Sequence, residues 1–248
     1  MPCLIRSRTS PISSFQRSCS AWRSILSSRT SLSSSLLARA ESLKWIGLLC
    51  MVLDHAGKYL ALSFVLSHPL GRCTFPLFAV AAAVQLCRPQ PNWRALRRVL
   101  VAAVVCFPFF YVVTRETIGP VLVTLSAGAL LFSACCLPPP ATLLGYLSSR
   151  RSAAVVGASA LALLGEYSLF GALYLAGVAR LLRGDRSAGA VAWFVVGSLG
   201  QLWTEGAFQF AACVLAPVLL FVVPALPRVR HFFLSFYVLQ WPALLVLR

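Results

Sequence analysis

Long apolar stretches alternate with short basic segments along most of the chain, and this pattern predicts a series of helices. A helix that crosses a bilayer needs about 20 predominantly apolar residues, and several stretches approach that length. A run of three prolines ends one stretch, and a Gly-Glu-Tyr sequence interrupts another. We expect nine helices, at 43–66, 75–87 (with a start as early as 72), 96–113, 119–137, two within 153–182 that divide at 165–167, 189–203, 207–223 and 231–247.

The composition excludes a soluble domain. Hydrophobic residues make up 59% of the 248 residues and charged residues only 11%, whereas a soluble domain carries about 25% charged residues. The nine cysteines show no paired spacing of the kind that holds zinc, and most lie within apolar stretches. We therefore expect an all-α, polytopic transmembrane helix bundle with neither a metal site nor a disulfide framework.

The net charge of +16 comes almost entirely from arginine. These arginines lie between the apolar stretches, as in the cytoplasmic loops of membrane proteins, so they indicate a lipid bilayer and no nucleic-acid partner. With the N-terminus in the cytoplasm, basic and non-basic loops alternate at every turn. The cytoplasmic segments are then the N-terminal tail, 88–98, 138–152, 180–188 and 224–230, and the opposite loops hold Arg72, Arg115, Glu116, Glu166, Glu205 and Arg248.

Residues 1–42 differ from the rest of the chain, because serine and arginine dominate and no acidic residue occurs before Glu41. This composition fits a transit peptide, a basic cytoplasmic tail lying against anionic lipid, or a translated leader ahead of a start further along. We expect a disordered tail or a mis-assigned start, followed by a transmembrane domain over 43–248.

Three ionisable residues, Asp54, His55 and Lys58, lie within the first predicted helix. At about 1.5 Å per residue Asp54 is roughly 16 Å from Leu43, near the centre of a bilayer core about 30 Å thick, where a charge is costly. Asp54 and Lys58 share a helix face, so they either neutralise each other or form a polar site. His55 diverges from Asp54 by about 100° around the helix and is either a general base or an interhelical hydrogen-bond donor.

Further candidates lie where predicted helices begin or break. Arg72 is expected in a turn, where it either anchors to lipid head groups or folds inward to bind Asp54 or a substrate anion. Glu166 and Tyr167 lie at a break between helices and are either solvated or part of a site.

A cluster of three arginines, Arg94, Arg97 and Arg98, follows the second predicted helix. It is either a determinant of topology or a means of attracting a phosphorylated cytosolic cofactor. No phosphate-binding loop or metal-ligand motif accompanies it.

Several motifs point to a known family. The sequence reads LKWI at 43–46, MVLDHAG at 51–57 and GRCTFPLF at 71–78. These stretches resemble the opening of the TraX family, which reads approximately L-K-x-I-A, M-x-x-D-H-x-G and G-R-x-x-F-P-x-F. The resemblance extends over roughly 43–247.

Later segments resemble the same family more weakly. They include VLVTL at 121–125 with Gly128, EY with FG at 166–171, and QF at 209–210. The ending FYVLQWPAL at 236–244 resembles F-Y-x-x-Y-P-x-H-L but lacks its histidine, and Pro120 stands where the family usually has asparagine.

The resemblance implies an integral-membrane acetyltransferase that uses acetyl-CoA, in a bacterial inner membrane. The family's name-giving member is associated with N-terminal acetylation of conjugative pilin, so the acceptor would be a pilin-like protein, a glycan or a lipid. His55 would take a proton from the acceptor's amine or hydroxyl, and Asp54 would hold the acceptor or balance a cation. Substrate contacts would come from Arg72, Lys58, Glu166 and Tyr167, and coenzyme phosphates would bind Arg94, Arg97 and Arg98.

Two other function classes fit the same residues. A buried Asp, His and Lys could form the proton relay of a proton-coupled transporter, although we find no internal repeat of the kind many transporters show. In an assembly or scaffold protein the polar residues would only hold helices together. Proton-driven uptake without acetyl transfer would identify the transporter, and loss of stability without loss of any chemistry would identify the scaffold.

Overall fold

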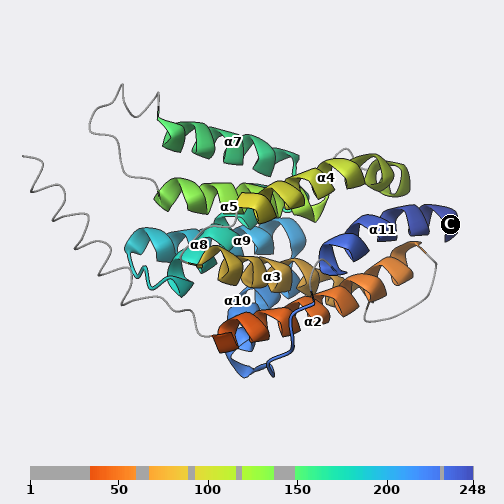
Figure 1. The fold of residues 1–248 in the computed structure, drawn as a ribbon, viewed down its shortest axis with the longest axis horizontal. Helices are drawn as coiled ribbons and strands as arrows, with labels where there is room; N and C mark the ends of the chain where they lie inside the picture. The colour runs from red at the N-terminus through yellow and green to blue at the C-terminus, as the bar shows by residue number, and fades with distance from the viewer. Residues whose placement is uncertain are drawn as a thin grey trace, which may run out of the picture.

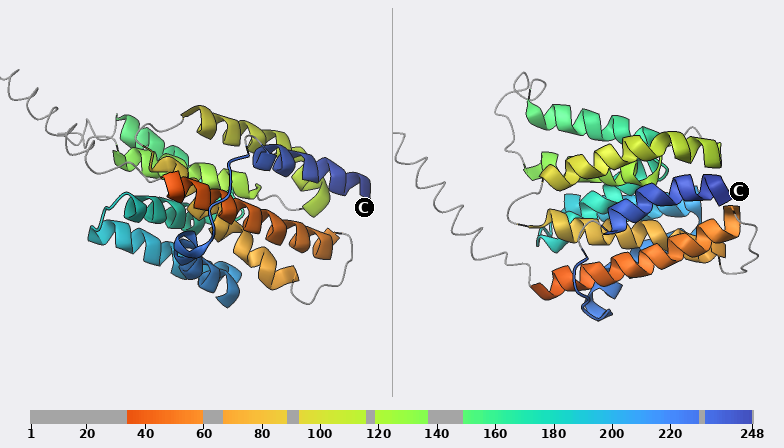
Figure 2. Two further views of the ribbon diagram at one scale, coloured as in Figure 1. Left: turned by 60° about the horizontal axis from the view of Figure 1, so that its bottom comes forward. Right: turned by 45° about the vertical axis from the view of Figure 1, so that its right-hand side comes forward.

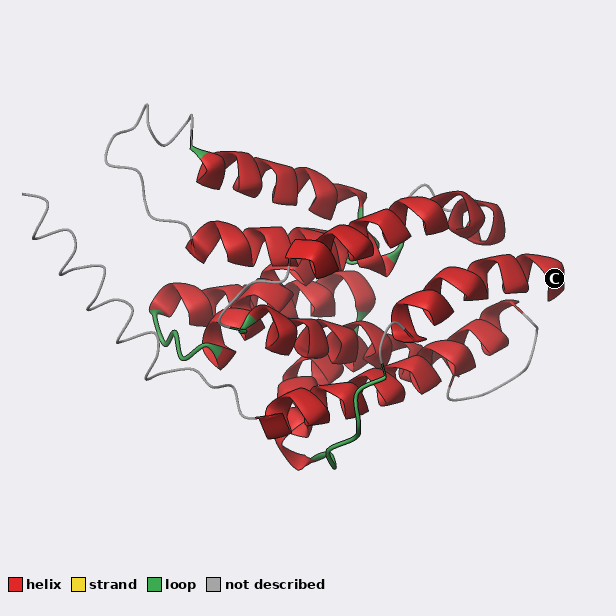
Figure 3. Cartoon of the chain, viewed as in Figure 1, coloured by secondary structure: helices red, strands yellow, loops and turns green. Residues whose placement is uncertain are grey.

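The computed structural model describes residues 34–59, 67–88, 93–115, 119–136, 149–229 and 232–247. Within these ranges the chain is all helical, with nine α-helices and no β-strand, as Figure 3 shows. The expected helical class and number are thus confirmed for the described residues. The helices are α2 (Ser34–Tyr59), α3 (Ser67–Leu86), α4 (Trp93–Thr114), α5 (Val121–Cys136), α7 (Arg150–Leu164), α8 (Ser168–Leu182), α9 (Ala188–Glu205), α10 (Ala207–Val222) and α11 (Phe232–Leu247).

Two helix starts differ from the sequence expectation. The helix expected from residue 43 begins at Ser34, because the intervening residues include good helix formers and Ala40 to Leu43 are buried against the bundle. The expected turn around Arg72 is helical instead, since α3 begins at Ser67. Its early Pro69 lies in the first helical turn, where a missing backbone N–H is tolerated. Arg72 therefore lies on a helix, in its second turn.

The helices stack in layers across the molecule (Figures 1 and 2). In Figure 1, α7, α5 and α4 lie along one side, α2 and α10 along the other, and α3, α8 and α9 between them. Neighbours in this arrangement are α2 with α3, α8 with α9, and α5 with both α7 and α8. The central helix α3 is buried along most of its length, including Phe75, Val80 and Val84.

Glycines allow the closest of these approaches. On α8, a side chain at Gly177 would overlap the backbone of Phe194 on α9. On α9, a side chain at Gly197 would overlap the backbone of Tyr174 on α8. Small residues at helix–helix contacts are typical of membrane bundles, where close packing replaces the hydrophobic driving force.

The helix ends and turns that the structure describes lie at two ends of the bundle. At one end the Arg39 guanidinium donates to the carbonyl of Phe221, and the Arg183 guanidinium donates to the Cys136 sulfur at 2.9 Å. We call this the basic end, defined by Arg39, Arg88, Arg183 and Arg228. The opposite end, which we call the site end, is defined by Lys58, Arg72, Gly119, Glu166 and Glu205.

Membrane-helix character is clear in two helices. The segments Pro69–Leu86 of α3 and Arg97–Thr114 of α4 are long and apolar enough to cross a bilayer, and α5, α8, α10 and α11 are shorter apolar helices. Large apolar side chains also face outward, including Val104 on α4, Phe208 and Val222 on α10, and Val246 on α11. Many large apolar side chains exposed on one chain suit contact with lipid.

Candidate functional site

A polar cavity of about 140 Å³ lies at the site end. It brings together six residues selected from the sequence, although they come from three separate parts of the chain. α2 contributes three of them, α3 one, and the turn between α7 and α8 the other two. The six residues are Asp54, His55, Lys58, Arg72, Glu166 and Tyr167.

The cavity is closer to the bundle end than the sequence suggested for Asp54. Around it lie Thr114, the last residue of α4, and Glu205, the last residue of α9. The expected depth at the membrane centre assumed a helix over 43–66, but α2 begins at Ser34 and its described part ends at Tyr59. The longer N-terminal part shifts Asp54 toward the site end, and residues 60–66 lie outside the described part.

The side chain of Asp54, on α2, packs against α3. Its Oδ2 forms an ion pair with Lys58 Nζ at 2.8 Å. Its Oδ1 is buried and has no hydrogen-bond partner in the described part of the chain. On α3, Gly71 lies directly against the carboxylate, and a methyl group there would overlap it. The absence of a side chain at Gly71 therefore lets Asp54 pack against the α3 backbone. One carboxylate oxygen remains available to a donor in the cavity.

His55 lies beside Asp54 in sequence but faces another way, as the helix geometry requires. Its ring packs against Trp241 on α11, with centroids 4.9 Å apart, and against Tyr59 at 5.6 Å. The Nδ1 atom is buried and has no hydrogen-bond partner among the described residues. Since His55 lines the polar cavity, its neutral imidazole can accept a proton from a group there through the ring nitrogen that carries no hydrogen.

Arg72 forms an ion pair with Glu205, at the end of α9. The sequence analysis considered lipid head groups, Asp54 and a substrate anion for Arg72, and the structure adds Glu205, which the sequence analysis did not name as a partner. A sequence signal was present, because Glu205 was expected in a loop on the same side of the bundle as Arg72. The pair joins α3 to the α9–α10 turn, where Gly206 adopts a positive φ of 92°. Arg72 is thereby positioned at the rim of the cavity.

The Glu166–Tyr167 turn is anchored to the bundle rather than solvated. The Glu166 N–H donates to the Gly119 carbonyl at 2.9 Å, and the Tyr167 N–H donates to Thr124 Oγ1 at 3.2 Å. The buried Tyr167 ring stacks on Phe75, with centroids 4.2 Å apart and planes 13° apart. These contacts connect three of the motif segments found in the sequence and place Glu166 at the cavity.

Aromatic side chains that the sequence analysis did not select form the inner wall. Trp241 contacts His55 and also packs edge-on against Phe110, with centroids 4.9 Å apart. Tyr237 lies one turn earlier on α11, and its ring centroid is 6.3 Å from that of Trp241. Both belong to the C-terminal FYVLQWPAL segment, so the motif was noticed in the sequence but its contact with His55 was not.

A second, apolar cavity of about 300 Å³ adjoins the polar one. It lies among α2, α3, α4, α5 and α11, and Val121 and Tyr237 line both cavities. Toward the basic end it is lined by Lys44, Arg98 and Arg228. The space therefore leads from a cationic mouth along apolar walls to the wall of the polar cavity.

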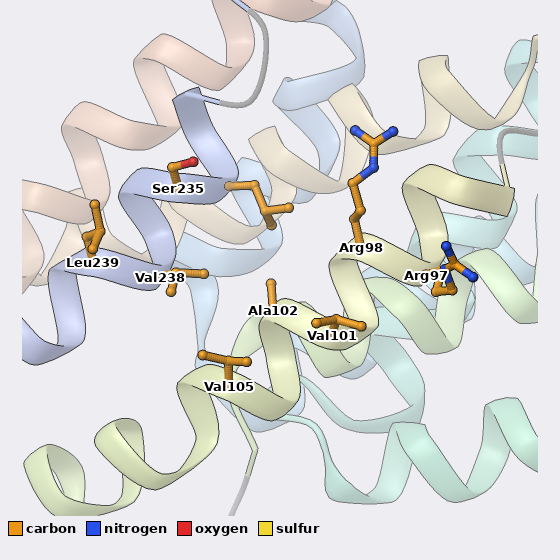
Figure 4. Close-up of a pocket in the computed structure, with 9 residues that line it drawn as sticks. Arg97, Arg98, Val101, Ala102, Val105, Ser235, Val238 and Leu239 are labelled. Carbon is orange, nitrogen blue, oxygen red and sulfur yellow. The ribbon is translucent and has the colours of Figure 1, made fainter.

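Two of the three expected coenzyme-binding arginines, Arg97 and Arg98, have described side chains, and only one of them lines the apolar cavity. Arg98 lines the apolar cavity, whereas Arg97 does not, although both line a groove between α4 and α11. Figure 4 shows their guanidinium groups pointing in different directions. Arg94 is the second residue of α4, and its side chain lies outside the described part. Lys44 and Arg228, which the sequence analysis did not select, line the cavity mouth together with Arg98.

The turn between α8 and α9, at the basic end, is held by the acidic residue Asp185. Asp185 accepts a hydrogen bond from the Ser187 N–H at 3.0 Å and pairs with Arg180 at 2.7 Å. These contacts hold the pKa of Asp185 below its usual value, the backbone hydrogen bond being the main cause. The pair is distant from the polar cavity, and we assign it a structural role in the α8–α9 turn.

The motifs around the polar cavity decide the family. A family model described as "TraX protein" matches residues 39–248. The chain belongs to the TraX family. The match includes both cavities and all six residues selected from the sequence, so the resemblance inferred from the motifs is confirmed. No curated protein and no solved structure matches this TraX-family chain.

The described residues contain no group of three His, Cys, Asp or Glu side chains that could hold a metal ion. The polar cavity itself offers one imidazole, two carboxylates, one ammonium and one guanidinium, together with Tyr167.

Proposed function

We propose that this TraX-family chain is a polytopic membrane acetyltransferase that transfers the acetyl group of acetyl-CoA to an amine or hydroxyl. Apolar outer faces and glycine-mediated helix contacts support a bundle that crosses the bilayer several times. The arginine distribution favours a basic end at the cytoplasm and a site end at the opposite face of a bacterial inner membrane. The proposal rests chiefly on one observation, that an apolar cavity with a cationic mouth adjoins the polar cavity of Asp54 and His55.

The cationic mouth is suited to the phosphates of the coenzyme. Arginine and lysine provide charge-assisted hydrogen bonds to phosphate oxygens, and Arg98, Lys44 and Arg228 surround the opening. The apolar walls suit a flexible arm that carries the thioester. The donor would thus enter from the cytoplasm, where acetyl-CoA is made, while the acceptor would reach the polar cavity from the site end.

His55 is the proposed general base. The acceptor nitrogen or oxygen forms a bond to the acetyl carbonyl carbon as His55 takes the acceptor's proton. The carbon–sulfur bond then breaks, and the proton passes from His55 to the leaving thiolate. Asp54, with one oxygen paired to Lys58 and the other unpartnered among the described residues, would hold the acceptor's second hydrogen or its cationic form. Arg72, Glu166 and Tyr167 would form the rest of the acceptor site.

The proposal is tested with purified protein in vesicles and radiolabelled acetyl-CoA. His55→Gln should lower kcat by about 10²- to 10⁴-fold, the usual contribution of a general base, with protein level and thermal stability unchanged. Full transfer by His55→Gln and by Asp54→Asn would refute the assignment of the site. Proton-driven uptake of a solute by vesicles that show no acetyl transfer would instead support a transporter.

The donor cavity has a matched pair of variants on one helix. Arg98→Ala removes a charge from the cavity mouth, and Arg97→Ala removes one from the neighbouring position that does not line it. A charge-assisted hydrogen bond contributes about 1.5–3 kcal/mol, so KM for acetyl-CoA should rise roughly tenfold or more in Arg98→Ala. Arg97→Ala should change KM little. Equal effects of the two variants would mean that the cavity is not the donor site.

A further inference from the structure

Another space in the molecule is lined by His55 and is separate from the apolar cavity proposed as the donor route. An apolar groove of about 390 Å³ runs between α2 and α11. Val52 and Ala56 line it from α2, and Phe236, Leu239 and Ala243 are among those that line it from α11. His55 lines both this groove and the polar cavity. The groove is therefore a second route to the proposed base, open along the side of the bundle.

The lining of the groove indicates the kind of molecule that suits it. Its lining residues on α11 extend from Phe232 to Leu247, a rise of about 22 Å at 1.5 Å per residue. Apart from His55, Ser235 and Gln240, every residue that lines the groove is apolar. A long apolar groove on the side of the bundle suits an extended hydrocarbon chain of a lipid.

The charges near His55 suit a lipid head group. Lys58 lies one helical turn beyond His55 toward the site end and is 47% exposed. It pairs with Asp54, but an ammonium has three donors and can also bind a phosphate oxygen. A lipid whose chain lies in the groove would therefore have a cation at the level of its phosphate and an imidazole close to its head group.

We propose that the acceptor is a phosphate-containing lipid with a free amine or hydroxyl in its head group, which reaches His55 from the bilayer through the α2–α11 groove. This inference rests on the proposed acetyltransferase function and names the substrate class of the same site. The lipid amine or hydroxyl bonds to the acetyl carbon, the thioester carbon–sulfur bond breaks, and the proton passes through His55 to the thiolate. The products are an acetylated lipid and free coenzyme.

The test uses the full chain in vesicles of phosphatidylethanolamine and phosphatidylglycerol with radiolabelled acetyl-CoA. Label should appear in the extracted lipid. Ala243→Trp places a large side chain in the groove and should lower lipid labelling by tenfold or more, while transfer to water-soluble ethanolamine is retained. Val246→Trp is the matched control, because Val246 is 85% exposed on the same helix and does not line the groove. It should keep lipid labelling.

Each outcome separates the two proposals. Transfer to ethanolamine or to a protein in the membrane, with lipid unlabelled or labelling unaffected by Ala243→Trp, would overturn the lipid acceptor and leave the acetyltransferase. Loss of transfer to every acceptor by the wild-type chain would overturn both. A phospholipid with a photoreactive chain provides a second measurement that does not depend on the tryptophan variant folding. Its crosslinks should map to the groove side of α11, near Leu239, and crosslinks confined to other helices would contradict the proposal.

Discussion

The contact between Gly71 and Asp54 leads to a sharp prediction for the variant Gly71→Ala. A Cβ at this position would lie 2.8 Å from Asp54 Cβ and closer still to the carboxylate. Side-chain carbons do not approach so closely, so either the carboxylate must turn away or α2 and α3 must separate. Both changes disturb the Asp54–Lys58 ion pair and the polar cavity.

The expected change in the stability of Gly71→Ala follows from two opposing contributions. Inserting a methyl group into a packed contact costs about 1–3 kcal/mol, whereas alanine is favoured over glycine within a helix by about 1 kcal/mol. Net stability should therefore fall by roughly 0–2 kcal/mol. Activity should fall further, because displacement of a catalytic group by about 1 Å can cost about 100-fold in rate. A large loss of transfer with a small loss of stability is the expected result.

The assay compares Gly71→Ala with Gly157→Ala, measuring acetyl transfer and thermal unfolding for each. Gly157 lies within α7, and a methyl group there would meet no atom within 4 Å. This control gains helix propensity without any new contact, so it should be as active as wild type and at least as stable. If Gly71→Ala matched the control in both measurements, the packing of Asp54 against α3 would be wrong.

Three further predictions concern contacts around the cavity and at the basic end. Glu205→Gln removes the carboxylate that pairs with Arg72 and should raise KM for the acceptor more than it lowers kcat. Glu205→Asp keeps a carboxylate, so its KM should lie between those of the wild type and Glu205→Gln. Unchanged kinetics in Glu205→Gln would exclude a role for the pair. Thr124→Val leaves the Tyr167 N–H without its acceptor and should lower stability by about 1–3 kcal/mol, measured by thermal unfolding; a smaller loss would mean that the turn is held by its other contacts. The pKa of Asp185 is lowered by folding, so its stabilising effect is present above the unfolded value of about 3.9 and is lost as the pH falls through the folded value. The stability difference between wild type and Asp185→Asn should therefore shrink on acidification below about pH 4, and a difference that grew there would contradict the assignment.

The sequence by itself determined the helical class, the number of helices in the described part and the family. Apolar stretches of near-bilayer length can only be helices or barrel strands, and their prolines, glycines and arginines marked where helices end. The motif residues Asp54, His55 and Glu166 could also be selected from the sequence, because an ionisable residue is conspicuous in so apolar a chain. The early starts of α2 and α3 were missed because polar residues in a first helical turn resemble a loop.

Only the tertiary structure decided which polar residues meet. Local patterning carries no information about distances between segments, so the sequence left Arg72 with three possible partners and did not propose Glu205. The contact of Gly71 with Asp54, and of Trp241 with His55, depends on how α3 and α11 pack against α2. The cationic mouth likewise combines residues from separate parts of the chain, namely Lys44, Arg98 and Arg228. Packing, which couples residues far apart in the chain, assembled the site that the sequence had supplied only in parts.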